Sequence, residues 1–414
     1  SSDRDSIALY PDLPCPYEEL TMHVLLAIGT RPEAIKVAPL YHALRSDPFF
    51  RVTTCITSQH RELLQQMLSF FDVRPDVDLQ VMQPRQTLAD LTCNVLNGAD
   101  RLLSETRPDL VVVQGDTTTA FTVGLAALYQ RIKVAHVEAG LRSFDLQQPF
   151  PEEANRRLVD VFSDYLFAPT EGAADNLRRE GYQDVSIFVT GNTGIDALLM
   201  ATEIVRRQGH PLPINLPAGS KLALLTAHRR ESFGDGLVRI CQAVLSLLER
   251  HPNLYILYPV HPNPNVQEAA HKYLAAHPRI YLCAPLEYPG FVSALAAADL
   301  ILTDSGGVQE EAPALGKRVL VLRETTERPE GIEAGVAELV GTDVDQIVAR
   351  ATALLSGSDA LGPVVSPYGD GRSSARIVEV LKTGALRDSF RTSGSSPQTA
   401  IPAPSKQKRA GSGR

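Results

Sequence analysis

The sequence of 414 residues has no tryptophan, only five cysteines and no long apolar run. No stretch approaches the roughly 18 apolar residues that a membrane-spanning helix requires, and the N-terminus lacks a basic region followed by an apolar core, so neither membrane insertion nor export is expected. The cysteines are odd in number and widely spaced, which favours buried thiols in a reducing compartment, here the cytoplasm, over disulfides or a metal site. A net charge of −8 offers no basic face for binding nucleic acid.

The chain is too long for one hydrophobic core, because domains usually comprise roughly 100 to 200 residues. Two successive series of alternating strand-like and helical patterns predict two α/β domains, each built on a parallel, doubly wound sheet. We expect a flexible head at 1–20, Rossmann-like domains at 21–190 and 191–371, a helix at 372–386 that returns to the first domain, and a disordered basic tail at 387–414. The two Rossmann-like halves would face each other across a cleft.

The expected strands are short apolar runs. In the first series they are Met22–Ile28, Val52–Thr57, Leu110–Val113, Lys133–Val137 and Tyr165–Phe167, and in the second Lys221–Leu225, Leu254–Pro259, Ile280–Cys283, Leu300–Thr303 and Val319–Leu322. The carboxyl ends of such strands are where open parallel sheets bind ligands. The residues that follow each strand are therefore the candidates for a functional site.

Acidic side chains gather at this edge of the first half. Glu138 directly follows a predicted strand, and Glu152 stands in the first turn of a helix whose start is marked by Pro149 and Pro151. Asp116 precedes a predicted helix in the same half. Each acid also has a purely structural explanation, since Asp116 could cap the helix that begins at Thr117 and Glu152 could interact with its own helix dipole.

A glycine-rich turn in the second half is suited to bind phosphate. Ser305-Gly306-Gly307 connects a predicted strand to a helix expected from Val308, so backbone N–H groups and the helix N-terminus could bind an anion there. Alternatively, Ser305 only caps the helix.

Three cationic groups lie at strand ends of both halves. Arg31 and Lys36 follow the first strand of the first half, and His228 follows the first strand of the second half. Arg31 alone could be a surface ion-pair partner. The three together favour a diphosphate bound between the halves.

Nine segments, in this order, closely resemble the non-hydrolysing UDP-N-acetylglucosamine (UDP-GlcNAc) 2-epimerases: GTRPEAIKVAPL, QGDTTTAF, HVEAGLRS, PEEANRR, GNTGIDAL, TAHRRESFG, YPVHPNPNV, TDSGGVQEEAPALGK and ETTERPEG. The resemblance spans about Met22 to Lys382. It implies a fold of the glycosyltransferase-B type and a homodimer. It also implies reversible C2 epimerisation to UDP-N-acetylmannosamine (UDP-ManNAc) through elimination and re-addition of UDP, with a 2-acetamidoglucal intermediate and without metal or nicotinamide. In many bacterial members a second UDP-GlcNAc acts as an allosteric activator.

The resemblance also implies roles for individual residues. The catalytic residues would be Asp116, Glu138, Glu152 and His228. The substrate would be bound by Arg31, Lys36, Phe291 beside the uracil, Ser305, Gly306, Gly307, Glu311 at the ribose hydroxyls, and Arg328, and an activator site would comprise Gln59, Arg85, Arg229 and His261. One departure from the family pattern is the turn at Ser143-Phe144-Asp145-Leu146, where a Thr-Gly-Asp turn is expected.

Three alternative functions fit much of the same pattern. A hydrolysing relative would release N-acetylmannosamine and UDP from a similar scaffold. A glycosyltransferase of the same fold would need an acceptor pocket, for which the sequence offers no feature. A regulator that binds nucleotide sugars without turnover is disfavoured because all three candidate acids are present.

Overall fold

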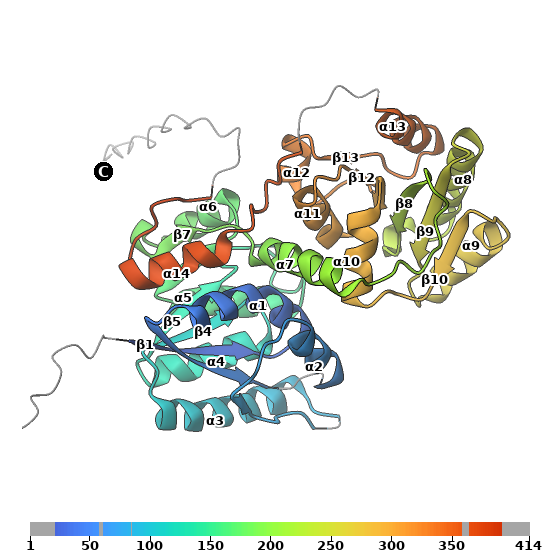
Figure 1. Cartoon of the computed structure of the whole chain (residues 1–414). Coiled ribbons are helices and arrows are strands. Elements are labelled where there is room, and N and C mark those ends of the chain that lie inside the picture. Colours follow the sequence, from blue (N-terminus) through green and yellow to red (C-terminus); the bar gives the residue numbers. More distant parts are fainter. Residues whose placement is uncertain (1–20, 58–60, 84, 358–363, 391–414) are drawn as a thin grey trace, which may run out of the picture.

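The computed structural model describes residues 21–57, 61–83, 85–357 and 364–390, and it contains two parallel sheets flanked by helices (Figure 1). The first sheet comprises β1 (Met22–Ile28), β2 (Phe50–Ile56), β3 (Val77–Asp78), β4 (Leu110–Gln114), β5 (Lys133–Val137), β6 (Tyr165–Ala168) and β7 (Ile187–Val189). The second comprises β8 (Lys221–Thr226), β9 (Leu254–Pro259), β10 (Ile280–Cys283), β11 (Leu300–Thr303), β12 (Val319–Val321) and β13 (Ala337–Leu339). The expected head and residues 391–414 of the expected tail lie outside the described residues. The first four residues of that tail, 387–390, are described, and Phe390 is buried and donates its N–H to the Val189 carbonyl oxygen at 2.9 Å.

Helices alternate with these strands. Those of the first half are α1 (Arg31–Ser46), α2 (Arg61–Phe70), α3 (Leu88–Thr106), α4 (Thr118–Tyr129), α5 (Glu152–Phe162), α6 (Glu171–Arg179) and α7 (Thr193–Gln208). Those that follow are α8 (Asp235–Arg250), α9 (Pro264–Leu274), α10 (Tyr288–Ala297), α11 (Gly306–Ala314), α12 (Pro329–Glu333), α13 (Val344–Ser356) and α14 (Ser373–Thr383). None of the described helices is both long and apolar enough to cross a bilayer.

Both sheets have the topology of a doubly wound fold. The strand orders are β3-β2-β1-β4-β5-β6-β7 and β10-β9-β8-β11-β12-β13. In each sheet the order reverses beside its first strand, between β1 and β4 and between β8 and β11, and ligands of such folds bind at this reversal. The predicted α/β class with two doubly wound parallel sheets is confirmed. Strands β3, β7 and β13 were not predicted, because runs of two or three residues carry no readable alternation.

Helix α7 connects the two halves. It packs against α1 on one side and against α10 and α11 on the other, and Figure 1 shows it running between the two sheets. Helix α14 packs against α1 and α7, and the Asp196 carboxylate of α7 accepts hydrogen bonds from the first amides of α14, those of Ser373 at 3.1 Å and Ser374 at 2.7 Å. Because the first turn of a helix has no acceptors of its own for these amides, Asp196 serves as the cap of α14.

The start of α1 depends on a buried carboxylate. Glu33 is only 1% exposed and accepts hydrogen bonds from the N–H groups of Gly29 at 3.0 Å and Thr30 at 2.6 Å, and from the Thr117 hydroxyl at 2.7 Å. Glu33 thereby links the turn after β1 to the turn after β4. Burial raises the pKa of Glu33 from 4.5 to about 7, because removal from water disfavours the charged form more than these hydrogen bonds favour it.

This raised pKa predicts a specific pH dependence of stability. Between pH values near 4.5 and 7 the folded protein keeps a proton on Glu33 that the unfolded chain has released, so Glu33 lowers the free energy of unfolding as the pH rises, by up to about 3 kcal/mol. Glu33→Gln removes this ionisation. Urea unfolding from about pH 5 to about pH 8 should therefore show the variant gaining stability relative to the parent as the pH rises. With the exposed Glu268→Gln as a baseline, a Glu33→Gln difference that stays constant over this range would contradict the raised pKa.

Candidate active site

A cavity of about 500 Å³ lies between the two halves, at the strand ends where both sheets reverse their order. Seven of the residues expected at a substrate site line it together: Arg31, Lys36, His228, Phe291, Ser305, Gly307 and Glu311. Burial raises the pKa of Glu311 to about 7, with the nearby Glu310 adding to the effect. The structure thus brings cationic, aromatic and acidic side chains from distant segments of the sequence together around one cavity.

The glycine-rich turn begins a helix earlier than predicted. Helix α11 starts at Gly306 rather than at Val308, so Gly306 and Gly307 form its first turn, whose amides have no acceptors within the helix. Ser305 occupies the N-cap position, but its side chain makes no capping hydrogen bond, so the view that Ser305 only caps the helix is not supported. A Cβ atom on Gly306 would lie 2.7 Å from the guanidinium carbon of Arg328, so only glycine allows Arg328 to approach this turn.

The loop after β8 is held by an acid that sequence reasoning missed. The buried carboxylate of Asp304 accepts the N–H groups of His228 at 2.6 Å and Arg229 at 2.7 Å, and lies 3.1 Å from Nδ1 of His228. His261 stacks on His228 with ring centroids 5.3 Å apart. Asp304 directly precedes the Ser-Gly-Gly turn, and this position in the sequence could have identified it. Asp304 fixes His228 at the edge of the cavity.

Glu138 lies against a cation and has an unusual backbone conformation. Its carboxylate oxygens are each 2.6 Å from Nζ of Lys36, and Gln114 donates a further hydrogen bond to it. Burial favours the neutral amine of Lys36, but the carboxylate of Glu138 outweighs this and raises the pKa of Lys36. Glu138 has φ 74°, a left-handed conformation that is rare for residues other than glycine and that concentrates at functional sites.

Asp116 is paired with an arginine of α5. Arg156 forms an ion pair with its carboxylate, and the Asn155 amide donates to its carbonyl oxygen at 3.0 Å. Burial raises the pKa of Asp116; Arg156 opposes this effect and the charge of Glu138 adds to it. The alternative that Asp116 caps α4 is wrong, because the hydroxyl of Thr117 accepts the Ala120 amide at 3.0 Å and serves as the cap.

Helix α5 brings the third acid to the same region. Glu152 is the first residue of α5 and lies one turn before Arg156 on the same helix face, and Arg156 reaches Asp116. The neighbouring Glu153 accepts the amides of Ser143 at 3.0 Å and Phe144 at 3.2 Å and so fixes the loop that departs from the family pattern. Phe144 has φ 63°. Glycine, expected there from the resemblance, fits this conformation better.

Two further residues of the site, one beside the acids and one at the cavity, were not identified from the sequence. Arg156, the partner of Asp116, was visible only as part of a basic run after Glu152. Tyr288 lines the cavity and packs against Phe70, the last residue of α2, and against the following Phe71, with ring centroids 6.2 and 6.0 Å away. The buried hydroxyl of Tyr288 has no hydrogen-bond partner among the described residues. No sequence pattern distinguished Tyr288 from a core aromatic.

Two of the four residues expected at an activator site lie together. Arg229 and His261 lie beside His228, and His261 also lines the cavity. Arg85 is exposed in the turn before α3 and is not among the described residues that line the cavity. Gln59 lies outside the described residues.

Known proteins share both the sequence and the fold of this chain. Residues 42–382 match the profile of the family described as UDP-N-acetylglucosamine 2-epimerase. The UDP-N-acetylglucosamine 2-epimerase of Escherichia coli K12 is 50% identical over 377 residues, covering 88% of this chain and 100% of the relative. The enzyme of the same name from Bacillus subtilis is 48% identical over 364 residues, covering 87% of this chain and 95% of the relative.

A solved structure gives the same result. The crystal structure of UDP-GlcNAc 2-epimerase from Neisseria meningitidis bound to UDP-GlcNAc has a TM-score of 0.80 and 42% sequence identity, and the match covers 87% of this chain and 100% of the other. The glycosyltransferase-B type of fold is thereby confirmed. On sequence and fold together, the chain belongs to the UDP-N-acetylglucosamine 2-epimerase family.

Proposed function

We propose that the protein interconverts UDP-GlcNAc and UDP-ManNAc in the cavity between its two halves. The observation that carries the proposal is the composition of this cavity. The cavity is lined by Arg31 and Lys36 from one half and by His228 and the N-terminus of α11 from the other. The amine of Lys36 also binds the carboxylate of Glu138 and interacts electrostatically with Asp116. The UDP-N-acetylglucosamine 2-epimerase of Escherichia coli K12 is 50% identical to this chain over its full length, and the structure of the Neisseria meningitidis relative contains bound UDP-GlcNAc.

The reaction requires a proton to leave C2 of the sugar from one face and to return on the other. In an elimination, a carboxylate takes the C2 proton, the C1–O bond breaks and UDP departs, leaving 2-acetamidoglucal. In the reverse sense, an acid delivers a proton to the opposite face of C2 while the β-phosphate oxygen re-forms its bond to C1. Two faces need two proton carriers, so one acid is insufficient.

The acids differ in the way that this chemistry needs. Burial raises the pKa of Asp116, which suits it to donate a proton, whereas Glu138 lies against the cationic amine of Lys36, which suits it to accept one. Glu152, the first residue of α5, is the third candidate carrier. Positioned acids and bases accelerate such reactions by roughly 10²- to 10⁴-fold, or about 3 to 5 kcal/mol, so they supply only part of a typical enzymatic acceleration.

The departing diphosphate must also be stabilised. Negative charge develops on its oxygens as the C1–O bond breaks, and fixed donors aimed at developing charge contribute strongly to catalysis. Arg31, Lys36, His228 and the first amides of α11 are the groups that would bind it. Arg328, beside Gly306, would contribute a further cation, and Glu311 and Phe291 would bind the ribose and the uracil.

The assembly and location of the protein belong to the same proposal. Leu128 and Tyr129 of α4 and Leu158 and Val161 of α5 are exposed on neighbouring helices, which supports a homodimer formed through this apolar face. Free thiols at all of the cysteines within the described residues support a reducing compartment, the cytoplasm. A second UDP-GlcNAc acting as an activator would bind near Arg229 and His261.

Incubation of UDP-GlcNAc with the protein in D₂O tests the reaction directly. Deuterium should appear at C2 of both UDP-ManNAc and recovered UDP-GlcNAc, because the proton that returns comes from solvent-exchanged acids, and NMR of the mixture measures it. An epimerised product with unlabelled C2 would refute the proton transfer. Free N-acetylmannosamine accumulating in step with UDP would instead favour the hydrolysing alternative.

Removal of one diphosphate ligand tests the role of the cations. Arg31→Ala should lower kcat by roughly 10²-fold or more, comparable with Glu138→Gln, because both act on the same transition state. Steady-state kinetics with UDP-GlcNAc measure the effect. Arg101→Ala, at an exposed position of α3 away from the cavity, is the matched control. Parental activity in Arg31→Ala would contradict the assignment of the diphosphate to this side of the cavity.

A further inference from the structure

A buried histidine on the strand that precedes Glu138 has both of its ring nitrogens in hydrogen bonds. His136, the fourth residue of β5, is completely buried. Its Nδ1 lies 2.6 Å from Oδ1 of Asp160 on α5, and its Nε2 lies 2.8 Å from the carbonyl oxygen of Gly115, the residue before Asp116. The chemistry proposed above does not use His136.

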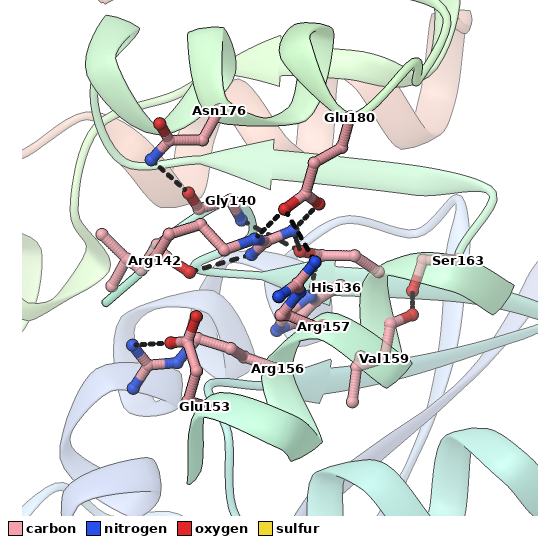
Figure 2. Close-up of polar contacts among 12 residues, drawn as sticks. His136, Gly140, Arg142, Glu153, Arg156, Arg157, Val159, Ser163, Asn176 and Glu180 are labelled. Carbon is pink, nitrogen blue, oxygen red and sulfur yellow. Dashed lines mark hydrogen bonds and ion pairs between the residues drawn. The ribbon is translucent and has the colours of Figure 1, made fainter. Parts of the chain in front are cut away.

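Asp160 has the surroundings of an ionised carboxylate. Besides His136 it meets two donors, the guanidinium of Arg142 at 2.7 Å and the amide of Gly140 at 3.3 Å. Arg142 also binds Glu180 at 2.7 Å, and Arg157 lies 3.5 Å from Glu180. Carboxylates and guanidinium groups therefore alternate outward from Asp160 (Figure 2). An ionised Asp160 has no proton to give, so Nδ1 of His136 must donate.

The other nitrogen must donate as well. A backbone carbonyl oxygen carries no hydrogen, so Nε2 can bind Gly115 only as an N–H donor. A neutral imidazole has one N–H and would leave one of the two buried acceptors facing a lone pair. The geometry therefore requires His136 to hold a proton on each nitrogen, as an imidazolium.

This cation joins the segments that carry the three acids. Through Gly115 it holds the end of β4 before Asp116, and it stands two residues before Glu138 on β5. Through Asp160 it holds α5, the helix that also carries Glu152 and Arg156. The left-handed residue Glu138 follows directly after β5, and strained residues persist only where their surroundings fix them.

We propose that His136 is a positioning residue, held as an imidazolium between Asp160 and Gly115, that sets the relative placement of the three catalytic acids. The proposal rests on the proposed function, since placement of the acids matters only if they transfer protons. It assigns His136 no contact with the substrate.

Two substitutions separate the two contacts. The side-chain amide nitrogen of asparagine can occupy the place of Nδ1, and that of glutamine the place of Nε2. His136→Asn therefore retains a donor for Asp160 and loses the one for Gly115, whereas His136→Gln retains the donor for Gly115 and loses the one for Asp160. His23→Gln is the matched control, because His23 is a buried histidine of the same sheet on the first strand, with side-chain partners Thr53 and Arg51.

Both His136 variants should lower kcat by roughly 10- to 100-fold, the cost of misplacing reacting groups by a fraction of an ångström to about an ångström. KM for UDP-GlcNAc should change by no more than about threefold, because the nucleotide is bound by other segments. Hydrogen exchange of the amides at 115–118 should accelerate in His136→Asn, and that of the amides at 139–142 in His136→Gln. His23→Gln should keep the parental kcat per folded molecule. A purely structural role would predict parental kcat per folded molecule in the His136 variants too, and that outcome would overturn the proposal.

The charge of His136 has its own measurement. In protein labelled with ¹⁵N-histidine, at about pH 7.5, the signals that disappear in His136→Asn should be those of two protonated ring nitrogens. A single N–H on that ring would overturn the imidazolium. Failure of the parent to epimerise UDP-GlcNAc would refute the proposed function instead, and the NMR and hydrogen-exchange results would still decide the state and the contacts of His136.

Discussion

Two acidic side chains can occupy one buried region only if nearby cations or a retained proton offset their mutual repulsion, and the site depends on this balance. Asp116 and Glu138 lie close enough to influence each other's charge, at the ends of adjacent strands. Arg156 binds the first and Lys36 the second. The two pairs differ, since one cation belongs to α5 beside the acids and the other lines the cavity. The acids are therefore held in different environments, as the transfer of a proton across a sugar carbon requires.

The topology of the sheets explains why these groups meet. Each sheet reverses its strand order beside its first strand, so the turns after β1 and β4 lie next to each other, as do those after β8 and β11. Glu33 connects the first pair of turns by accepting the Thr117 hydroxyl, and Asp304 connects the second pair by accepting the backbone amides of His228 and Arg229. Buried acids thus act as fixed acceptors that shape both walls of the cavity, while helix α7 holds the walls together.

Much of this arrangement could be predicted from the sequence. The fold class and most strands followed from the alternation of apolar runs with helical patterns, whereas the family followed from the nine segments that resemble it. Among the candidate residues that line the cavity, Arg31, His228 and Ser305 follow their strands closely, whereas Phe291 and Glu311 were expected from the resemblance alone. What could not be predicted depends on contacts between distant segments. In the sequence Arg156 and Tyr288 resemble ordinary helix residues, because their roles depend on the contact of α5 with Asp116 and of α10 with α2. The start of α11 at Gly306 was missed because glycine is a poor helix former, although here the close approach of Arg328 requires it.

The central claim is that the cavity stabilises UDP as it leaves the sugar. Its most direct measurement uses UDP-GlcNAc labelled with ¹⁸O at the bridging oxygen between C1 and the β-phosphorus, with ³¹P NMR of the recovered nucleotide sugars. If UDP departs and returns, the label will distribute between the bridging and non-bridging positions of the β-phosphate in step with epimerisation. Epimerised UDP-ManNAc that retains all of its label in the bridging position would contradict the account.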